Sequence, residues 1–210
     1  MSQSSNALLP GLNRPPYRIT KPLIIILAAS LNVVACSRSA VADKSEEPTS
    51  WSIKIVPENE PGEPLIVTGT IYSPDGKQPL EGIMLYVYQT DATGVYTTTG
   101  GENRGTRIRG VMRTNAQGRY EFRTIKPGSY PNSRNPAHIH AYLSGPGYPE
   151  YWIEEYHFAG DSFISDQDRR QASGQGTFSP ILHPTRGADG ILRAVRDIRI
   201  ERCTRNCTGR

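Results

Sequence analysis

Leu65-Ile-Val-Thr-Gly-Thr-Ile-Tyr72 is followed by the turn signal Pro74-Asp75-Gly76 and then by Ile83-Met-Leu-Tyr-Val-Tyr-Gln89. The two outer segments are rich in β-branched and aromatic residues, which favour the half-buried surface of a β-strand. Proline, aspartate and glycine between them favour a turn. This stretch therefore predicts two strands separated by a tight connection.

The same pattern continues along the chain. Further strands are predicted at 110–114, 119–125, 137–143, 151–158 and 192–200, and the four-residue segment Asn115-Ala-Gln-Gly118 predicts a hairpin between the first two of these. No segment after residue 50 shows the 3.6-residue apolar spacing of an amphipathic helix. Six or seven short strands predict an all-β fold, an antiparallel β-sandwich with long loops.

Length and composition agree with one such domain. The chain has 210 residues, which is too few for an enzyme with a separate cofactor-binding fold. Its 20 glycines and 17 prolines indicate many turns and argue against a helical bundle. The formal net charge is +4. Three of the cationic residues, Arg14, Arg18 and Lys21, lie before residue 36, in a segment that has no acidic residue. The rest of the chain is nearly neutral, so we expect no nucleic-acid partner.

Residues 1–35 have the layout of a secretory signal, with the three cations followed by the apolar run 22–35. At about 14 residues this run is too short to span a bilayer, so it predicts export rather than a transmembrane helix. Val33-Val-Ala-Cys36 resembles a bacterial lipoprotein box, in which Cys36 is acylated and becomes the new N-terminus. The alternative is ordinary cleavage after Ala42. We therefore expect a periplasmic or outer-membrane-anchored lipoprotein, or else a secreted protein.

The sequence divides into a signal peptide (1–35), a flexible tether (36–50), the β-sandwich domain (51–202) and a C-terminal tail (203–210). The tether has no large apolar residue beyond Val41. In the tail, Cys203 and Cys207 form a disulfide loop or stay as free thiols. Zinc is disfavoured because no second pair of cysteine or histidine ligands lies nearby at zinc spacing.

The segment Pro136-Ala-His-Ile-His140 offers a candidate metal site. Side chains at positions i and i+2 of a strand project from the same face, so His138 and His140 can reach one ion while Ile139 points to the core. The spacing alone, however, more often belongs to a half-solvated strand face than to a metal site.

Three other segments occur with this one in a fixed order: Gln89-Thr-Asp-Ala-Thr-Gly-Val-Tyr96, Gly118-Arg-Tyr-Glu-Phe-Arg-Thr-Ile-Lys-Pro-Gly-Ser-Tyr-Pro131 and Phe158-Ala-Gly-Asp161. Over about residues 65–163 the chain resembles the intradiol ring-cleavage dioxygenases, the family of protocatechuate and catechol dioxygenases. The resemblance implies a non-haem Fe(III) ion bound by Tyr96, Tyr130, His138 and His140. It also implies insertion of both atoms of O2 into a catechol-type aromatic diol, to give a cis,cis-muconate. A homo-oligomer is compatible with the sequence.

This set of ligands suits ferric iron. A phenol with an ordinary pKa of about 10 loses its proton when it binds a highly charged cation. Two phenolates and two neutral imidazoles favour Fe(III) over Fe(II). The resemblance further implies that Tyr130 is the axial tyrosine, which leaves the metal and takes a proton from the incoming diol.

Two positions depart from the family pattern. Many members have arginine directly before Pro-Ala-His-x-His, where this chain has Asn135 with Arg134 one place earlier. Many have glutamine fifteen residues after the second histidine, where this chain has Glu155. Both changes disfavour a carboxylated catechol. We assign Arg134 as a candidate catalytic cation, and Asn135 and Glu155 as residues of the substrate pocket. The alternative function is a non-catalytic module that binds iron or aromatic compounds at the cell surface.

Overall fold

The computed structural model describes residues 50–98 and 105–202, and the structural statements below concern these residues. The signal peptide with Cys36, the tether and the tail with Cys203 and Cys207 lie outside this part of the chain, apart from residue 50. Among the described residues, no helix is long and apolar enough to cross a membrane.

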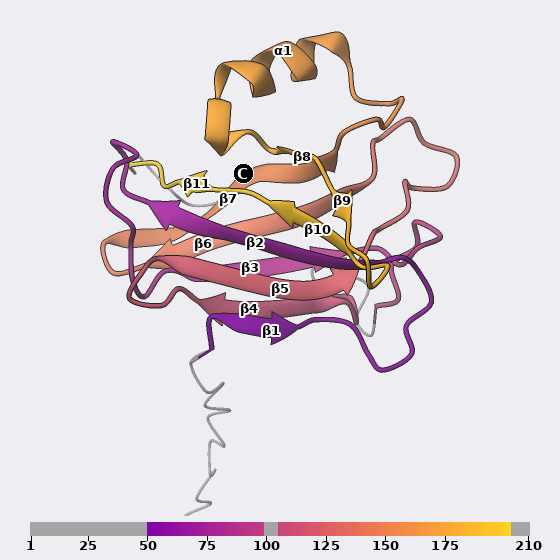
Figure 1. Cartoon of the computed structure of the whole chain (residues 1–210), viewed down its shortest axis with the longest axis horizontal. Coiled ribbons are helices and arrows are strands. Elements are labelled where there is room, and N and C mark those ends of the chain that lie inside the picture. Colours follow the sequence, from indigo (N-terminus) through magenta and orange to yellow (C-terminus); the bar gives the residue numbers. More distant parts are fainter. Residues whose placement is uncertain (1–49, 99–104, 203–210) are drawn as a thin grey trace, which may run out of the picture. The chain divides into compact units, whose positions relative to one another are not determined.

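Two β-sheets form the described domain, as the sequence predicts (Figure 1). The strands of the first sheet follow the order β1-β5-β2-β10-β9, with β11 also paired to β2. Those of the second follow the order β4-β3-β6-β7-β8. The bounds are β1 (Ser52–Lys54), β2 (Pro64–Tyr72), β3 (Met84–Gln89), β4 (Arg109–Arg113), β5 (Arg119–Ile125), β6 (His138–Gly145), β7 (Tyr148–Phe158), β8 (Ile181–Leu182), β9 (Thr185–Arg186), β10 (Leu192–Val195) and β11 (Ile198–Arg199).

The longest strands pair antiparallel, as expected for this class of sandwich. These ladders join β2 to β5, β3 to β4, β3 to β6 and β6 to β7. Short strands extend the sheets by parallel pairing: β1 with β5, β10 and β11 with β2, and β8 with β7. Parallel pairing requires a long connection between partners, which the distances along the chain provide in each case.

The sequence predicted that the strands on either side of residues 115–118 pair with each other in a hairpin, and this prediction is wrong. The turn itself forms, because Oδ1 of Asn115 accepts hydrogen bonds from the backbone N–H groups of Gln117 and Arg119 at 3.0 Å each. However, β4 before it pairs with β3, and β5 after it pairs with β2 in the other sheet. A turn signal determines that the chain reverses, but not which sheet the next strand joins.

The predicted strand 192–200 is interrupted at Arg196 and Asp197, so that β10 and β11 are separate. At the interruption the backbone N–H of Arg196 donates to the carbonyl oxygen of Thr68 at 2.9 Å. Oδ1 of Asp197 accepts a hydrogen bond from the backbone N–H of Thr70, also at 2.9 Å. The break therefore stays attached to β2.

A helix that the sequence pattern does not predict, α1 (Asp166–Gly174), follows β7 and leads into the short 3-10 helix η2 (Gly176–Phe178). Ser165 and Asp168 form a reciprocal capping box at its start. Ala172 is the one buried residue of α1, so there is no apolar stripe to detect. Figure 1 shows α1 next to β8, along one side of the sandwich.

The core lies between the two sheets and contains a buried polar link. Nε2 of Gln89, on β3, donates to the carbonyl oxygen of Ile125 on β5 at 2.9 Å. Oε1 of Gln89 accepts a hydrogen bond from Oγ1 of Thr124 at 2.9 Å. Because its hydrogen bonds are satisfied, this buried amide joins the two sheets without leaving an unpaired polar group. The core also contains large, fully buried side chains: Leu65, Ile71, Leu85, Tyr120, Phe122, Ile139, Leu143 and Phe158.

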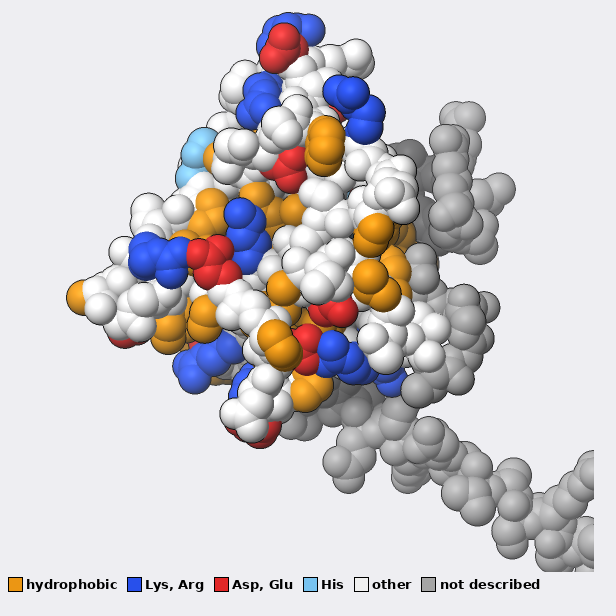
Figure 2. Space-filling view, turned by 90° about the vertical axis from the view of Figure 1, so that its right-hand side faces the viewer, with side chains coloured by type: hydrophobic (Ala, Val, Ile, Leu, Met, Phe, Trp, Pro, Cys, Tyr) orange, Lys and Arg blue, Asp and Glu red, His pale blue; other side chains and the backbone are white. Residues whose placement is uncertain are grey.

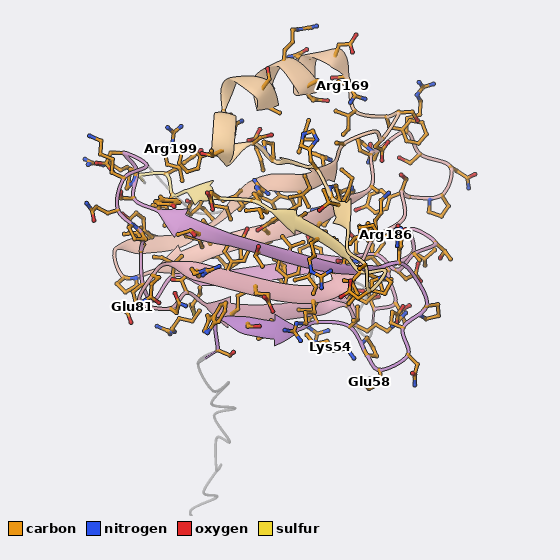
Figure 3. All side chains as sticks on the ribbon, viewed as in Figure 1. Lys54, Glu58, Glu81, Arg169, Arg186 and Arg199 are labelled. Atoms are coloured by element: carbon orange, nitrogen blue, oxygen red, sulfur yellow. The ribbon has the colours of Figure 1, made fainter. Side chains whose placement is uncertain are left out.

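Charged residues are distributed over the surface. On the face seen in Figure 2, cationic and anionic side chains lie near one another. Lys54 and Glu58, both labelled in Figure 3, pair in this way at 2.8 Å. Exposed pairs contribute little to folding, so the stability of the domain rests on its apolar core.

Candidate metal centre

Strand β6 holds two histidines on the outer face of the second sheet. Ile139 is fully buried in the core, so strand alternation turns His138 and His140 to the opposite face. Both imidazoles are nonetheless 7% exposed, because aromatic side chains and loops cover them. A rigid strand therefore presents the two rings together, as the sequence predicts.

The two predicted tyrosines lie on loops that pack closely at glycines. Gly94 lies two residues before Tyr96 and adopts a φ of +81°. A Cβ atom at Gly94 would lie 1.8 Å from the carbonyl oxygen of Ser129, next to Tyr130. A Cβ atom at Gly128 would meet the backbone of the first loop at 2.6 Å. Glycine at both positions is what lets the two tyrosine loops come together.

Asp91 organises the first of these loops. Its Oδ1 atom accepts hydrogen bonds from the backbone N–H groups of Thr93 and Val95, at 2.8 and 3.1 Å. Its carbonyl oxygen accepts one from the backbone N–H of Gly128, on the second loop, at 2.9 Å. The same residue thus shapes one tyrosine loop and attaches it to the other.

Four donor atoms converge where the loops meet β6. The phenol oxygens of Tyr96 and Tyr130 are 2.8 Å apart. The Tyr130 oxygen lies 3.1 Å from Nε2 of His138 and 3.1 Å from Nε2 of His140, and these two nitrogens are also 3.1 Å apart. Two donors bound at about 2.1 Å to one ion lie about 3.0 Å apart when the bonds form a right angle. The spacing of the four atoms therefore fits one metal ion, with two oxygen and two nitrogen ligands.

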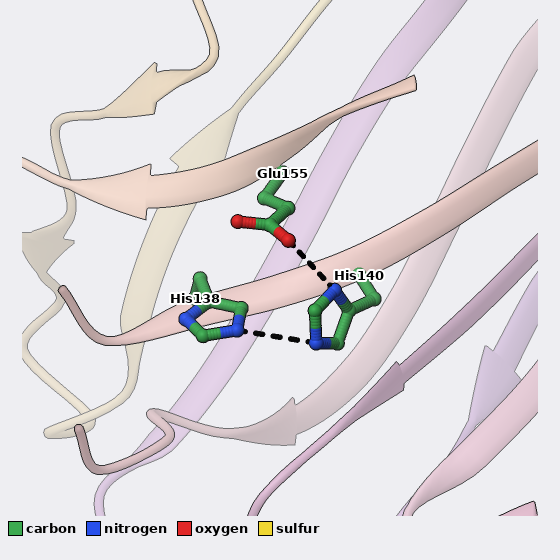
Figure 4. A group of neighbouring side chains, drawn as sticks. All are labelled: His138, His140 and Glu155. Carbon is green, nitrogen blue, oxygen red and sulfur yellow. Dashed lines mark hydrogen bonds and ion pairs between the residues drawn. The ribbon is translucent and has the colours of Figure 1, made fainter. Parts of the chain in front are cut away.

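The outer nitrogen of each imidazole lies close to an oxygen atom. Nδ1 of His138 lies 2.7 Å from the carbonyl oxygen of Pro136, to which it donates. Nδ1 of His140 lies 2.9 Å from Oε1 of Glu155 (Figure 4). With the proton on Nδ1, the lone pair of each Nε2 is directed at the site, which is the tautomer that a metal requires.

A β-bulge places Glu155 beside His140. Ile139 pairs with Tyr156 while Ala141 pairs with Ile153, so Glu154 and Glu155 together oppose His140. The extra residue breaks the alternation of β7, and such bulges redirect side chains next to functional sites. Tyr156 is consequently buried, and Glu155 faces the histidine.

Glu155 contacts one of the four converging residues but is not itself among the converging donors. Donor atoms of His138, His140 and Glu155 all lie within 4.8 Å of one another. The carboxylate, however, approaches His140 at Nδ1, whereas Nε2 faces Tyr130 and His138. An ion among the four converging atoms would thus have Glu155 on the far side of the His140 ring.

Burial favours the neutral forms of Tyr96, Tyr130 and His138 when no cation is present. It raises the pKa of Tyr96 and, although a hydrogen bond with Tyr96 opposes it, that of Tyr130. Burial lowers the pKa of His138. Burial also raises the pKa of Glu155, but contact with His140 and the nearby imidazoles outweighs it, and the net pKa is below the usual value. Metal binding would therefore release phenol protons.

Two predicted site residues are not brought to this cluster. Arg134 is exposed, and its guanidinium lies over the ring of Phe163 at 5.8 Å. Asn135 is exposed, with its backbone N–H donating to Oγ of Ser133 at 3.0 Å. Their described contacts do not include the four donor residues. The catalytic role of Arg134 and the pocket role of Asn135 stay predictions.

Two aromatic residues that the sequence pattern did not single out enclose His140. The ring of Tyr88 stacks on it at 4.5 Å, and Trp152 meets it edge-on at 4.8 Å. Strand alternation places Tyr88 on the outer face of β3, but its position opposite His140 follows from the register between β3 and β6. The two rings restrict the orientation of the imidazole.

Comparison with known proteins agrees with this geometry. A family model described as Dioxygenase matches residues 41–177. Catechol 1,2-dioxygenase 2 of Acinetobacter lwoffii is 25% identical over 162 residues, which cover 70% of this chain and 53% of that protein. The protocatechuate 3,4-dioxygenase beta chain of Burkholderia cepacia is 34% identical over 114 residues, covering 50% of this chain and 48% of that protein. The chain spans about half the length of the curated relatives it matches.

A solved structure is similar over most of the described domain. It is the dioxygenase domain of a dioxygenase carbohydrate-binding protein fusion from Streptomyces sp. SirexAA-E. That domain is 28% identical to this chain, with a TM-score of 0.55, and the match covers 75% of this chain and 91% of the Streptomyces domain.

Proposed function

The chain belongs to the intradiol ring-cleavage dioxygenase family, and we propose that it is an Fe(III) enzyme acting on a catechol-type aromatic diol. The enzyme would insert both atoms of O2 and cleave the ring between the two hydroxylated carbons, giving a cis,cis-muconate-type product. The observation that carries this proposal is the convergence of two phenol oxygens and two imidazole nitrogens at 2.8 to 3.1 Å.

Each residue has a role that follows from its contacts. Ferric iron, when bound, would supply the Lewis acidity and the electron-accepting capacity that the reaction needs. Pro136 and Glu155 fix the imidazoles so that their Nε2 lone pairs face the ion. Tyr130 is central in the cluster, since its oxygen contacts Tyr96 and both histidines. That oxygen is therefore placed to receive a proton from an incoming diol.

The charges near the site support an uncharged catechol as the substrate. Glu155 is a carboxylate beside His140, and its negative charge disfavours a second carboxylate nearby. Arg134, the cation expected to offset a negative ring substituent, is exposed over Phe163. Catechol or an alkylated catechol is accordingly favoured over protocatechuate.

We further propose the location that the sequence predicts, namely export with acylation of Cys36, or secretion if cleavage follows Ala42. Intact-mass measurement of the mature N-terminus distinguishes a diacylated or triacylated cysteine from a free N-terminus at residue 43.

An iron assay with a visible spectrum tests the enzymatic proposal. The protein reconstituted with ferric iron should hold about one iron per chain and be red-brown, from tyrosinate-to-iron charge transfer. The band should shift when catechol is added without oxygen, and oxygen uptake should follow aeration. A colourless protein that does not retain ferric iron would reject the proposal.

The exposed positions of Arg134 and Asn135 favour a second candidate, the non-catalytic binding module. That candidate predicts a coloured, iron-loaded protein that binds catechols but consumes no oxygen with any of them. Oxygen uptake with a panel of uncharged catechols, measured on iron-loaded protein, separates the two functions.

A further inference from the structure

Arg196 is a buried cation without a counter-ion. It occupies the break between β10 and β11 and is 4% exposed. Its Nε and Nη1 atoms are buried and have no hydrogen-bond partner. Within residues 50–98 and 105–202, the ion pairs do not include Arg196.

An aromatic ring offsets part of this cost. The guanidinium carbon of Arg196 lies 4.1 Å from the centre of the Tyr156 ring, a close cation–π contact. That contact covers one face of the guanidinium plane, whereas Nε and Nη1 have no hydrogen-bond partner. An anion bound from solution would offset the unfavourable burial of a charge with unpaired donors.

Arg196 lines a cavity of about 530 Å³. The cavity lies between β7, β11 and η2, with Trp152, Phe178 and Ile198 among its apolar walls. Its volume is within the usual range for small-molecule sites. Arg199 lies beside it, labelled in Figure 3, with its guanidinium over the Phe178 ring at 5.4 Å.

The charges around this cavity restrict the anion that it suits. Glu154 and Glu201 also line it, and Glu154 accepts a hydrogen bond from Nε2 of Gln175 at 2.9 Å. Two carboxylates disfavour a multiply charged ligand such as phosphate. A singly charged anion with an apolar body would pair with the guanidinium and bury its remaining surface against the aromatic walls.

We propose that the cavity bounded by β7, β11 and η2 is a binding site for a small organic monocarboxylate. The carboxylate pairs with the guanidinium of Arg196, and the apolar part of the ligand lies against Trp152 and Phe178. The cavity shares Trp152 with the surroundings of His140, but Arg196 is not one of the four converging donors, and the proposal does not depend on the proposed reaction.

Benzoate is a suitable probe, with benzyl alcohol as its uncharged counterpart and inorganic phosphate as the multiply charged one. Binding is measured by calorimetry, before and after removal of metal with a chelator. We expect benzoate to bind in both states, at least tenfold more tightly than the alcohol or phosphate. Binding that disappears with the metal, or no binding at millimolar benzoate, would overturn the proposal.

Variants of the two arginines localise the site. Arg196→Met should weaken benzoate binding at least tenfold, whereas Arg199→Met, which removes a cation from the same cavity, should change it less than threefold. Equal effects of the two variants would contradict the assignment. If Arg196→Met does not fold, Arg196→Lys is the second test, because lysine keeps the charge but lacks the planar pair of donors. Unchanged benzoate affinity in Arg196→Lys would also reject the proposal.

Discussion

Oε1 of Glu155 lies 2.9 Å from Nδ1 of His140, on the side of the ring away from Tyr130. A carboxylate in this position holds an imidazole in one orientation and makes its other nitrogen a stronger ligand. The contact exists because the bulge in β7 places both Glu154 and Glu155 opposite His140. The glutamate that departs from the family pattern therefore contacts one of the proposed metal ligands.

Replacing Glu155 by leucine, which removes the acceptor, should weaken ferric-iron binding by about 10- to 100-fold, the usual effect of losing a partner of a metal-bound histidine. Competition with a chelator of known affinity measures this. Glu154→Leu is the matched control, because Glu154 shares the bulge but bonds to Gln175 instead. Equal losses in the two variants would show that the effect comes from the bulge and not from the contact with His140.

Gly94→Ala should separate the two tyrosine loops. The new methyl group would overlap the carbonyl oxygen of Ser129, so we expect a loss of about 1–3 kcal/mol in the free energy of unfolding and weaker iron binding. Gly147→Ala is the control, since Gly147 also has a positive φ of +79° but no neighbour within 4 Å. Gly147→Ala should cost about 1 kcal/mol and leave the colour of the iron-loaded protein unchanged. A coloured Gly94→Ala protein with normal iron affinity would contradict the role assigned to this close approach.

Loss of a converging donor should remove the iron. Tyr130→Phe and His138→Ala each delete an atom of the cluster, and iron content measured after reconstitution should fall well below one per chain. Tyr151→Phe serves as the control for removal of a tyrosine hydroxyl, because Tyr151 instead accepts a hydrogen bond from the backbone N–H of Glu201 at 2.9 Å. Full iron loading of Tyr130→Phe with an unchanged spectrum would exclude Tyr130 from the ligand set.

The metal-free protein should lose stability as the pH falls from 8 to 5. Burial lowers the pKa of His138 and of His157, so the unfolded chain binds protons in this range before the folded chain does. The contribution of these pKa differences to folding stability is fully present above the unfolded pKa of about 6.5. It is lost as the pH falls through the pKa values of the folded protein. Urea unfolding at several pH values measures it.

His157→Asn should reduce this pH dependence, while replacement of the exposed His183 by asparagine should not. A metal-free protein that becomes more stable toward pH 5 would contradict the assignment of His138 and His157 as neutral in the folded protein.

Local sequence determined most of the strands. The segments 65–72, 83–89 and 119–125 were predicted from β-branched and aromatic content, and the structure has strands at all three, with β5 matching residue for residue. The position of the turn at Asn115 was likewise local, because its side chain bonds to the backbone two and four residues later. The short helix α1 was missed because a polar helix with one buried residue has no apolar periodicity.

The four residues that converge were predicted as iron ligands from the family resemblance, which the order of their motifs carries. Which atoms face one another was decided by the tertiary structure, because it depends on strand register, on the bulge opposite His140 and on two loops meeting at glycines. The same holds for Arg196, whose guanidinium meets the ring of Tyr156 on β7, far away in the sequence, while Nε and Nη1 have no partner. Strand formation depends on neighbours along the chain, whereas a site depends on contacts between segments far apart in it, and only folding brings those segments together.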